Sequence, residues 1–281
     1  MDVELARTFL EVMSAGTFLD ASKRLNVTQT TITARINSLE EKLDSKLFIR
    51  NRSGAKLTSD GERFVEYATS LVQLWDRARA EIRLPQGLDT RLCIGAENSL
   101  WNPLMINWVL WIQAHIPNLA LHSDVANSDV LLERLEAGGL DAAIIHRPKY
   151  HSGLVIEQIM EEKLIHVQSV DSPKPDLFIN WSEEFRSQYD SALPQPRQTA
   201  YSFNLGPLAL QIMLQQGGNG YFRTRVVKQY IERGKLERVP QSPEFTHPVF
   251  VVYKKNKMTE SLNSALLGLK SQAKKDIQWY L

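Results

Sequence analysis

The sequence predicts an α/β protein with an all-α-rich N-terminal domain: a winged helix-turn-helix, a long linker helix and a two-lobed α/β domain. Three observations lead to this fold class. Short amphipathic helices with capping residues reach to about Lys42 and are followed by a short hairpin, and a helical pattern then runs from Ser59 until Pro85. After Arg91, apolar runs of strand length alternate with helical segments. We expect domains at 1–58, 59–88 and 89–281, with lobe one over about 89–160 and 248–281 and lobe two over about 161–247.

The composition is that of an ordinary globular protein, with 43% hydrophobic and 23% charged residues. No apolar run approaches the ~18 residues of a transmembrane helix. The first residues lack the basic segment and apolar core of a signal peptide. The single cysteine, Cys93, excludes an internal disulfide framework and fits a reducing compartment. We therefore expect a cytoplasmic protein with no membrane partner.

The first helices are predicted from spacing and caps. Leu5, Phe9 and Val12 share one helical face, and Gly16 is placed to end that helix. Thr17 is expected to cap a short second helix. After a turn at Asn26-Val27, Thr28 is expected to cap a third helix that runs to about Lys42. Two short strands around Asn51–Gly54 then form a basic hairpin, the wing of a helix-turn-helix domain.

The third helix begins with the run TQTTIT, although threonine is a poor helix former. In a helix-turn-helix these first turns enter the major groove, where threonine and glutamine side chains read base edges. Between Ser22 and Leu57 eight basic residues stand against three acidic ones, a charge pattern that favours DNA. The alternative is a solvated helix whose hydroxyls bond its own backbone. We predict double-stranded DNA as a partner, with base contacts from the helix and phosphate contacts from Arg35 and the wing. The predicted contact residues are Thr28, Gln29, Thr30, Thr31, Thr33, Arg35, Arg50, Arg52 and Lys56.

This segment resembles the N-terminal domain of LysR-type transcriptional regulators. The family pattern is roughly S-F-x-x-A-A-x-x-L, then V-S-Q-x-x-[VL]-S-x-x-I-x-x-L-E-x-x-L-G-x-x-L-F-x-R, then L-T-x-x-G. The chain matches it at Phe18, Ala21, Leu25, Val27, Gln29, Ile36, Leu39, Glu40, Leu43, Leu47, Phe48, Arg50, Leu57, Thr58 and Gly61. It departs at Ser22, Thr28, Thr33 and Asp44, of which Asp44 stands where the family has glycine. Aspartate can take the left-handed conformation at modest cost.

The linker helix is expected to open with a capping box from Ser59 to Glu62. Its ~25 residues would span about 38 Å at 1.5 Å per residue. The apolar residues follow a heptad spacing that needs a partner helix. Packing against the chain itself is the alternative, but the resemblance implies antiparallel pairing with a second copy, as in the DNA-binding dimer of the family. The predicted dimer contacts are Phe64, Tyr67, Leu71, Leu74 and Ala78.

The last domain is predicted as two α/β lobes. Lobe one has strands at 92–96, 120–125 and 141–146, expected to be parallel, with helices Ser99–His115 and Ser128–Ala137 between them. Separate strands at 154–160 and 163–169 follow, with Glu161–Lys163 between them as a solvated loop. Lobe two then has strands at 177–181, 198–203 and 220–222, a short strand from Leu236, and helices from Ser182, about Leu205 and Arg223. The strand 247–253 and a helix from Met258 return to lobe one.

Two lobes crossed by two strands make a periplasmic-binding-protein-like clamshell, which the LysR family also carries. The resemblance thus covers nearly the whole chain, tapering between about Asp171 and Pro196. Strand ends and helix starts between the lobes suit a small-molecule effector, such as a small carboxylate. Ser99 and Ser128 as mere helix caps, and Trp101 as core, are the alternatives. The candidate effector residues are Asn98, Ser99, Trp101, Ser128, His146, Arg147, Phe203 and Asn204.

No catalytic motif is present, the six histidines lack metal-ligand spacing, and Cys93 lies in an apolar strand. We therefore predict no enzyme, no catalytic residue, no metal site and no cofactor. The resemblance implies a bacterial transcriptional regulator that forms a dimer or homotetramer, with RNA polymerase as a possible partner. The alternative is a constitutive or architectural DNA-binding protein whose second domain only oligomerises.

Overall fold

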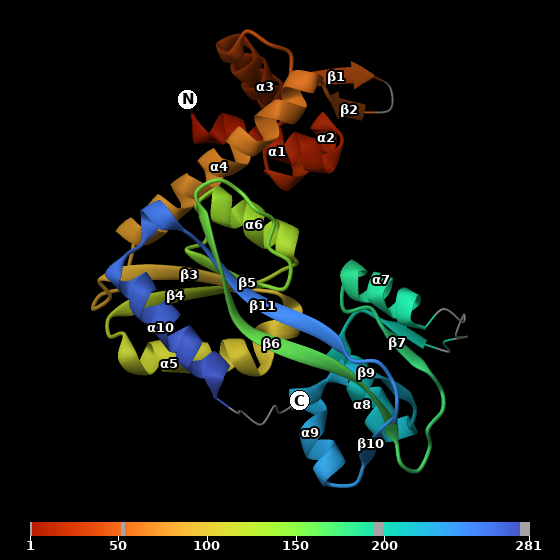
Figure 1. The fold of residues 1–281 in the computed structure, drawn as a ribbon. Helices are drawn as coiled ribbons and strands as arrows, with labels where there is room; N and C mark the ends of the chain where they lie inside the picture. Colours follow the sequence, from red (N-terminus) through yellow and green to blue (C-terminus); the bar gives the residue numbers. More distant parts are fainter. Residues whose placement is uncertain (1, 52–53, 194–198, 200, 276–281) are drawn as a thin grey trace. The chain divides into compact units, whose positions relative to one another are not determined.

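The computed structural model describes residues 2–51, 54–193, 199 and 201–275 (Figure 1). The chain forms two compact units, one of Met1–Arg91 with Glu133–Leu140 and one of Leu92–Leu132 with Asp141–Leu281. None of the helices in the described ranges is long and apolar enough to cross a bilayer.

The first unit begins with three helices and a hairpin, and the predicted caps are confirmed. Gly16 ends the first helix in the left-handed conformation, with φ 72°. The Thr17 hydroxyl accepts a hydrogen bond from the Asp20 N–H at 3.0 Å, and the Thr28 hydroxyl accepts one from the Thr31 N–H at 3.2 Å. The elements are α1 (Val3–Ala15), α2 (Phe18–Arg24), α3 (Gln29–Leu43), β1 (Phe48–Asn51) and β2 (Gly54–Leu57).

The core of this unit is aromatic. The Phe9 ring lies between Phe48 and Phe64, with centroid distances of 5.2 and 5.1 Å. Asp44 ends α3 with φ 47° and ψ 39°, as expected for a residue in the usual glycine position. A Cβ on Gly61 would lie 2.2 Å from the Leu47 carbonyl oxygen, so only glycine lets the next helix approach the wing this closely.

The long helix α4 (Ser59–Ile82) has 24 residues, but the predicted cap is wrong by one position. Thr58, rather than Ser59, caps the helix, because its hydroxyl accepts a hydrogen bond from the Gly61 N–H at 2.9 Å. Phe64 is also not available to a partner helix, since it is buried in the core of its own unit.

Most of the second unit is built on one sheet in the order β10-β6-β11-β5-β3-β4, with β9 also paired to β6. Of these strands, β4 is Leu119–Val125, β9 is Asn219–Arg223 and β10 is Leu236–Arg238. The predicted parallel pairing is confirmed for β3 (Thr90–Ala96) and β5 (Ala142–Ile145). The two strands expected at 154–160 and 163–169 are a single strand, β6 (Leu154–Ser169). It runs beside β11 (Phe245–Lys254) from one lobe into the other (Figure 1).

The helix expected from Ser99 to His115 is broken. A short 3₁₀ turn (Asn98–Leu100) and an irregular turn (Trp101–Met105) precede α5 (Ile106–His115). Asn102 has extended dihedral angles, φ −123° and ψ 123°. The residue before a proline is disfavoured in the helical region, and Pro103 follows Asn102. The sequence therefore contained the signal for the break.

The remaining elements follow the predicted order. Lobe one also contains β4 (Leu119–Val125), α6 (Ser128–Glu136) and α10 (Glu260–Lys274). Lobe two comprises β7 (Leu177–Ile179), α7 (Glu183–Ala192), β8 (Tyr201–Phe203), α8 (Gly206–Gln216), β9 (Asn219–Arg223), α9 (Thr224–Glu232) and β10 (Leu236–Arg238). The strand expected at 198–203 lies partly outside the described residues. Trp108 is buried in the core of lobe one and Phe222 in that of lobe two.

Candidate DNA-binding surface and interlobe site

The N-terminal turn of α3 presents hydroxyl and amide groups to solvent. Thr28, Gln29 and Thr30 are exposed, whereas Ile32 and Ile36 are fully buried on the opposite side of the helix. The Thr28 hydroxyl lies within hydrogen-bond distance of two neighbouring hydroxyls, those of Thr30 at 2.7 Å and Thr31 at 2.8 Å. Packing of the buried face therefore stabilises this threonine-rich helix, and the polar side chains of the opposite face point to solvent. Thr31 and Thr33 are half-buried.

The basic side chains near α3 differ in how they are held. Arg35 donates to the Thr8 hydroxyl at 3.3 Å and lies 3.7 Å from the Glu4 carboxylate, so it packs against α1. Arg50 stacks on the Phe18 ring at 3.9 Å from its centroid. Lys56 is exposed on β2. Arg52 lies outside the described residues.

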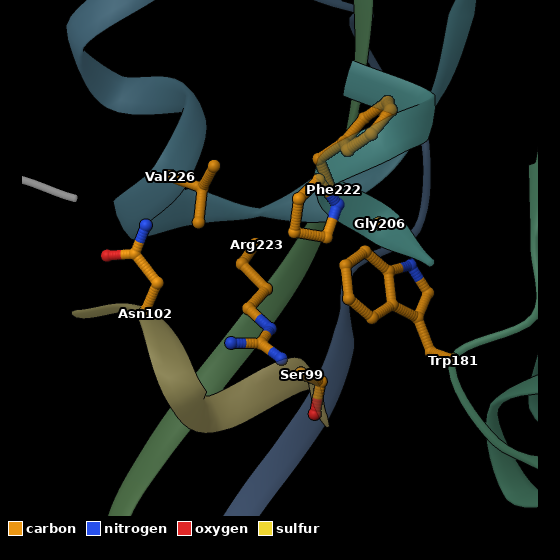
Figure 2. A pocket seen from close by; sticks show the side chains of 8 residues that line it. Ser99, Asn102, Trp181, Gly206, Phe222, Arg223 and Val226 are labelled. Atoms are coloured by element: carbon orange, nitrogen blue, oxygen red, sulfur yellow. The ribbon is translucent and has the colours of Figure 1, made fainter. Parts of the chain in front are cut away.

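A small cavity lies between the two lobes. Ser99 and Asn102 line it from lobe one, and six residues line it from lobe two (Trp181, Gly206, Pro207, Phe222, Arg223 and Val226). Its volume is about 20 Å³, room for about one water molecule. Figure 2 shows Arg223 extending across the cavity with its guanidinium toward Ser99. A Cβ on Gly206 would lie 2.1 Å from Trp181 Cη2, so the glycine makes room for the indole ring.

Behind Ser99, a chain of hydrogen bonds joins three elements of the fold. The Ser99 hydroxyl lies 3.0 Å from His146 Nε2, and His146 Nδ1 lies 2.9 Å from the Pro248 carbonyl oxygen. Glu97 accepts a hydrogen bond from the His146 backbone N–H at 2.9 Å and another from the Ser128 hydroxyl. Ser99 and Ser128 thus contact side chains of lobe one, those of His146 and Glu97, and their hydroxyls do not stand free at a helix start.

A buried ion pair, Arg223 with Glu162, lies beside the cavity. Arg223 Nε is 3.1 Å from the Glu162 carboxylate, and both side chains are almost fully buried. His247 stacks on His146 at a centroid distance of 3.7 Å. Burial, together with the nearby Arg223 charge, lowers the pKa of His247 to about 3. Burial also holds the pKa of His146 well below its ordinary value, with smaller effects from His247 and Arg223. Both imidazoles are therefore neutral near neutral pH.

Two protein-family descriptions match the chain, one at the N-terminal domain and one over most of the rest. Residues 85–270 match the family described as the LysR substrate binding domain. Residues 3–62 match the bacterial regulatory helix-turn-helix proteins of the lysR family. The chain belongs to the LysR family of transcriptional regulators. The fold class, the DNA-binding domain and the effector-binding domain predicted from the sequence are thereby confirmed, and this family consists of regulators rather than enzymes.

Individual relatives of this LysR-family regulator match over almost their full length. It is 28% identical to the HTH-type transcriptional regulator HdfR of Yersinia pestis (strain Pestoides F), over 95% of both chains. The crystal structure of the LysR regulator CbnR has a TM-score of 0.67 at 20% identity, over 98% of this chain and 100% of that one. LysG of Corynebacterium glutamicum with bound effector Arg has a TM-score of 0.59 at 16% identity, over 97% and 98%. At these identities the two structures show a shared fold.

Of the eight effector residues predicted for this LysR-family regulator, one lines the cavity, two lie in the hydrogen-bonded group behind it, and five lie elsewhere. Ser99 lines the cavity, and Ser128 and His146 lie in the hydrogen-bonded group behind it. Arg147 does not line the cavity; it is half-exposed and lies 3.8 and 3.9 Å from the carboxylates of Glu183 and Glu184. The others do not line the cavity: Trp101 is 40% exposed, Phe203 packs in the core of lobe two, and Asn98 and Asn204 are exposed.

Sequence reasoning missed seven of the eight residues that line the cavity, and also Glu97 and Glu162 beside it; three of these residues fit a rule that it had already used. Glu97, Trp181 and Arg223 each lie at or just after the end of a strand, the position that identified Ser99 and His146. The same rule could have found them. A fourth residue, Glu162, lies in the expected solvated loop Glu161–Lys163, but that segment is part of β6 and Glu162 is buried.

Proposed function

We propose that this LysR-family regulator reads operator DNA with the start of α3 and the wing, as a dimer joined through α4, and responds to a small molecule bound between the lobes. The observation that carries the DNA part is the N-terminal turn of α3. There Thr28, Gln29 and Thr30 are exposed on a helix whose opposite face is buried. Gln29 is assigned to base reading because its amide can pair with an adenine edge in two hydrogen bonds.

The proposed dimer uses the exposed apolar stripe of α4, and two dimers would form the tetramer implied by the family. Closing the lobes on an effector would shift the population between two arrangements of the DNA-reading helices. RNA polymerase is the proposed partner for activation, and the cytoplasm, where bacterial chromosomes lie, is the proposed location. Full-length CbnR, which shares this fold, has been solved in complex with its target DNA, and this supports the proposal that the chain binds DNA.

The DNA assignment is tested with Gln29→Ala and Lys56→Ala in binding titrations against a set of operator variants at several salt concentrations. Gln29→Ala should cost about 1–3 kcal/mol of binding free energy and relax the preference at one base position. Lys56→Ala should weaken all variants alike and reduce the salt dependence, because a phosphate contact releases counterions but reads no sequence. If Gln29→Ala leaves the ranking of operator variants unchanged, Gln29 does not read a base.

The effector assignment is tested by footprinting on the protein's own promoter region in the presence of a metabolite panel. A change in the footprint supports regulation by a small molecule. A footprint that no metabolite changes would favour the alternative, a constitutive DNA-binding protein whose second domain only oligomerises.

A further inference from the structure

The place expected to receive a ligand carboxylate is already taken by a carboxylate of the chain. Glu97 follows directly on β3 and lies at the start of α6, where it accepts hydrogen bonds from the Ser128 hydroxyl and from the His146 backbone N–H. Two donors expected to bind an anion on lobe one, the Ser128 hydroxyl and the His146 N–H, are therefore taken by Glu97. A second carboxylate at this place would meet the like charge of Glu97.

The hydrogen-bond direction at Ser99 leads to the same result. The Pro248 carbonyl can only accept, so His146 Nδ1 donates to it across 2.9 Å. Because burial keeps His146 neutral, its Nε2 carries no proton and must accept from the Ser99 hydroxyl, 3.0 Å away. The Ser99 proton is thus directed away from the cavity, and its lone pairs remain to receive a donor. On the lobe-one wall, Ser99 therefore accepts hydrogen bonds.

Both arginines next to the site are already paired with carboxylates of the chain. Arg147 lies 3.8 and 3.9 Å from the carboxylates of Glu183 and Glu184, and the Glu97 carboxylate lies behind Ser99. The other guanidinium, that of Arg223, is paired with Glu162. Arg223 nevertheless points toward Ser99 from lobe two (Figure 2). A cation of the chain itself therefore lies across the cavity from the accepting wall.

From these contacts we infer that the effector presents an ammonium or guanidinium group, not a carboxylate, to Glu97 and Ser99. This inference rests on the proposed effector-binding function and specifies the chemistry of that site. The cavity of about 20 Å³ is too small for such a molecule as it stands. Binding requires the Arg223 guanidinium to withdraw or the lobes to separate, and the cation of the ligand then replaces that of Arg223 at the accepting wall.

The test uses the purified full chain and two pairs of probes of similar size: agmatine against adipate, and phenethylamine against 3-phenylpropionate. Binding is measured by isothermal titration calorimetry for the wild type, Glu97→Gln and Ser99→Ala. Glu260→Gln serves as the control, because it removes an exposed carboxylate from the same domain at the start of α10. Circular dichroism verifies that each variant is folded, and Ser99→Ala keeps the test valid if Glu97→Gln does not fold.

At least one of the two amines should bind the wild type and the Glu260→Gln variant, while neither acid binds. Glu97→Gln should weaken amine binding by roughly ten- to a hundredfold, the value of a hydrogen bond to a charged group, and Ser99→Ala by a smaller factor. Binding of the acids alone, or amine binding that neither substitution weakens, would overturn the inference while leaving an effector site in place. If neither class binds, the inference fails, and a footprint that no metabolite changes would then remove the proposed effector function as well.

Discussion

The Glu40 carboxylate near the end of α3 accepts a hydrogen bond from the backbone N–H of Leu47 at 3.0 Å, which ties α3 to the wing. The same carboxylate accepts from the Phe48 N–H at 3.3 Å and from Lys46 Nζ at 2.6 Å. Glu40 is buried, so water cannot replace it as acceptor for the two backbone N–H groups, whereas the Lys46 side chain is exposed. Glu40 therefore helps to hold the wing against α3, together with the hydrogen bond that Arg50 donates to Asn37.

Glu40→Gln should lower the free energy of unfolding by about 1–3 kcal/mol, because an amide places N–H groups where the backbone also donates. Thermal unfolding of the full chain and hydrogen exchange of the wing would measure the loss. Glu41→Gln is the matched control, since Glu41 is the exposed neighbour on the same helix. Equal effects of the two substitutions would contradict the role assigned to Glu40.

The Glu40 contacts also predict a pH dependence. Burial raises the pKa of Glu40, but the hydrogen bonds from Lys46, Leu47 and Phe48 outweigh it and hold the pKa below its ordinary value of 4.5. A carboxyl with a depressed pKa stabilises the fold above that ordinary value and loses the contribution as the pH falls through the folded pKa. The stability difference between the wild type and Glu40→Gln should therefore shrink below pH 4.5.

Dimerisation through α4 is predicted to depend on a stripe that differs in part from the heptad positions in the sequence. Tyr67, Leu74, Trp75 and Ile82 are exposed by 68%, 54%, 49% and 86%. Leu74→Asp/Trp75→Asp should shift sedimentation to smaller species and weaken operator binding, because carboxylates would face each other on an apolar seam. Ala80→Asp is the control, since Ala80 lies about 120° and 140° around the helix from Leu74 and Trp75, so that the substitution adds a carboxylate on another side. An unchanged sedimentation profile would mean that α4 is not the dimer contact.

The buried pair of Glu162 and Arg223 predicts a large difference between breaking the pair and removing it. Glu162→Gln leaves the buried guanidinium without its counter-charge and should cost about 3–5 kcal/mol. The double variant Glu162→Leu/Arg223→Met should cost less, because no buried charge remains. Glu161→Gln, at the exposed neighbouring position of β6, should stay within about 0.5 kcal/mol. Chemical denaturation of the full chain measures all three, and a double variant less stable than Glu162→Gln would contradict the argument.

The parts predicted well from the sequence are those fixed by neighbouring residues. Thr17 and Thr28 cap their helices through N–H groups three positions on, and Asp44 takes the left-handed conformation that its place at a helix end requires. The cap at Thr58 was misplaced because Ser59, beside it, fits the same local pattern.

The parts that were missed depend on contacts between distant segments. Glu162 was expected in a solvated loop, because its position opposite His247 on β11 and its approach to Arg223 on β9 cannot be read from its own neighbourhood. The same holds for Phe64, whose heptad position does not reveal that the Phe9 ring covers it. The contact between the Glu97 carboxylate and Ser128 at the start of α6 likewise joins segments that are distant in the sequence. Glu97 lies 31 positions before Ser128 in the chain.

A single strand that passes through both lobes has a consequence for how this domain unfolds. β6 pairs with β11 over Leu154–Leu164 and with β9 over Leu164–Gln168, so its backbone amides belong to the hydrogen-bond ladders of both lobes. If one lobe unfolds, β6 loses part of its hydrogen-bonded partners, although the rest of β6 still belongs to the sheet of the other lobe. The two lobes therefore form one cooperative unit, and damage to the core of one is expected to lower the melting temperature of the other.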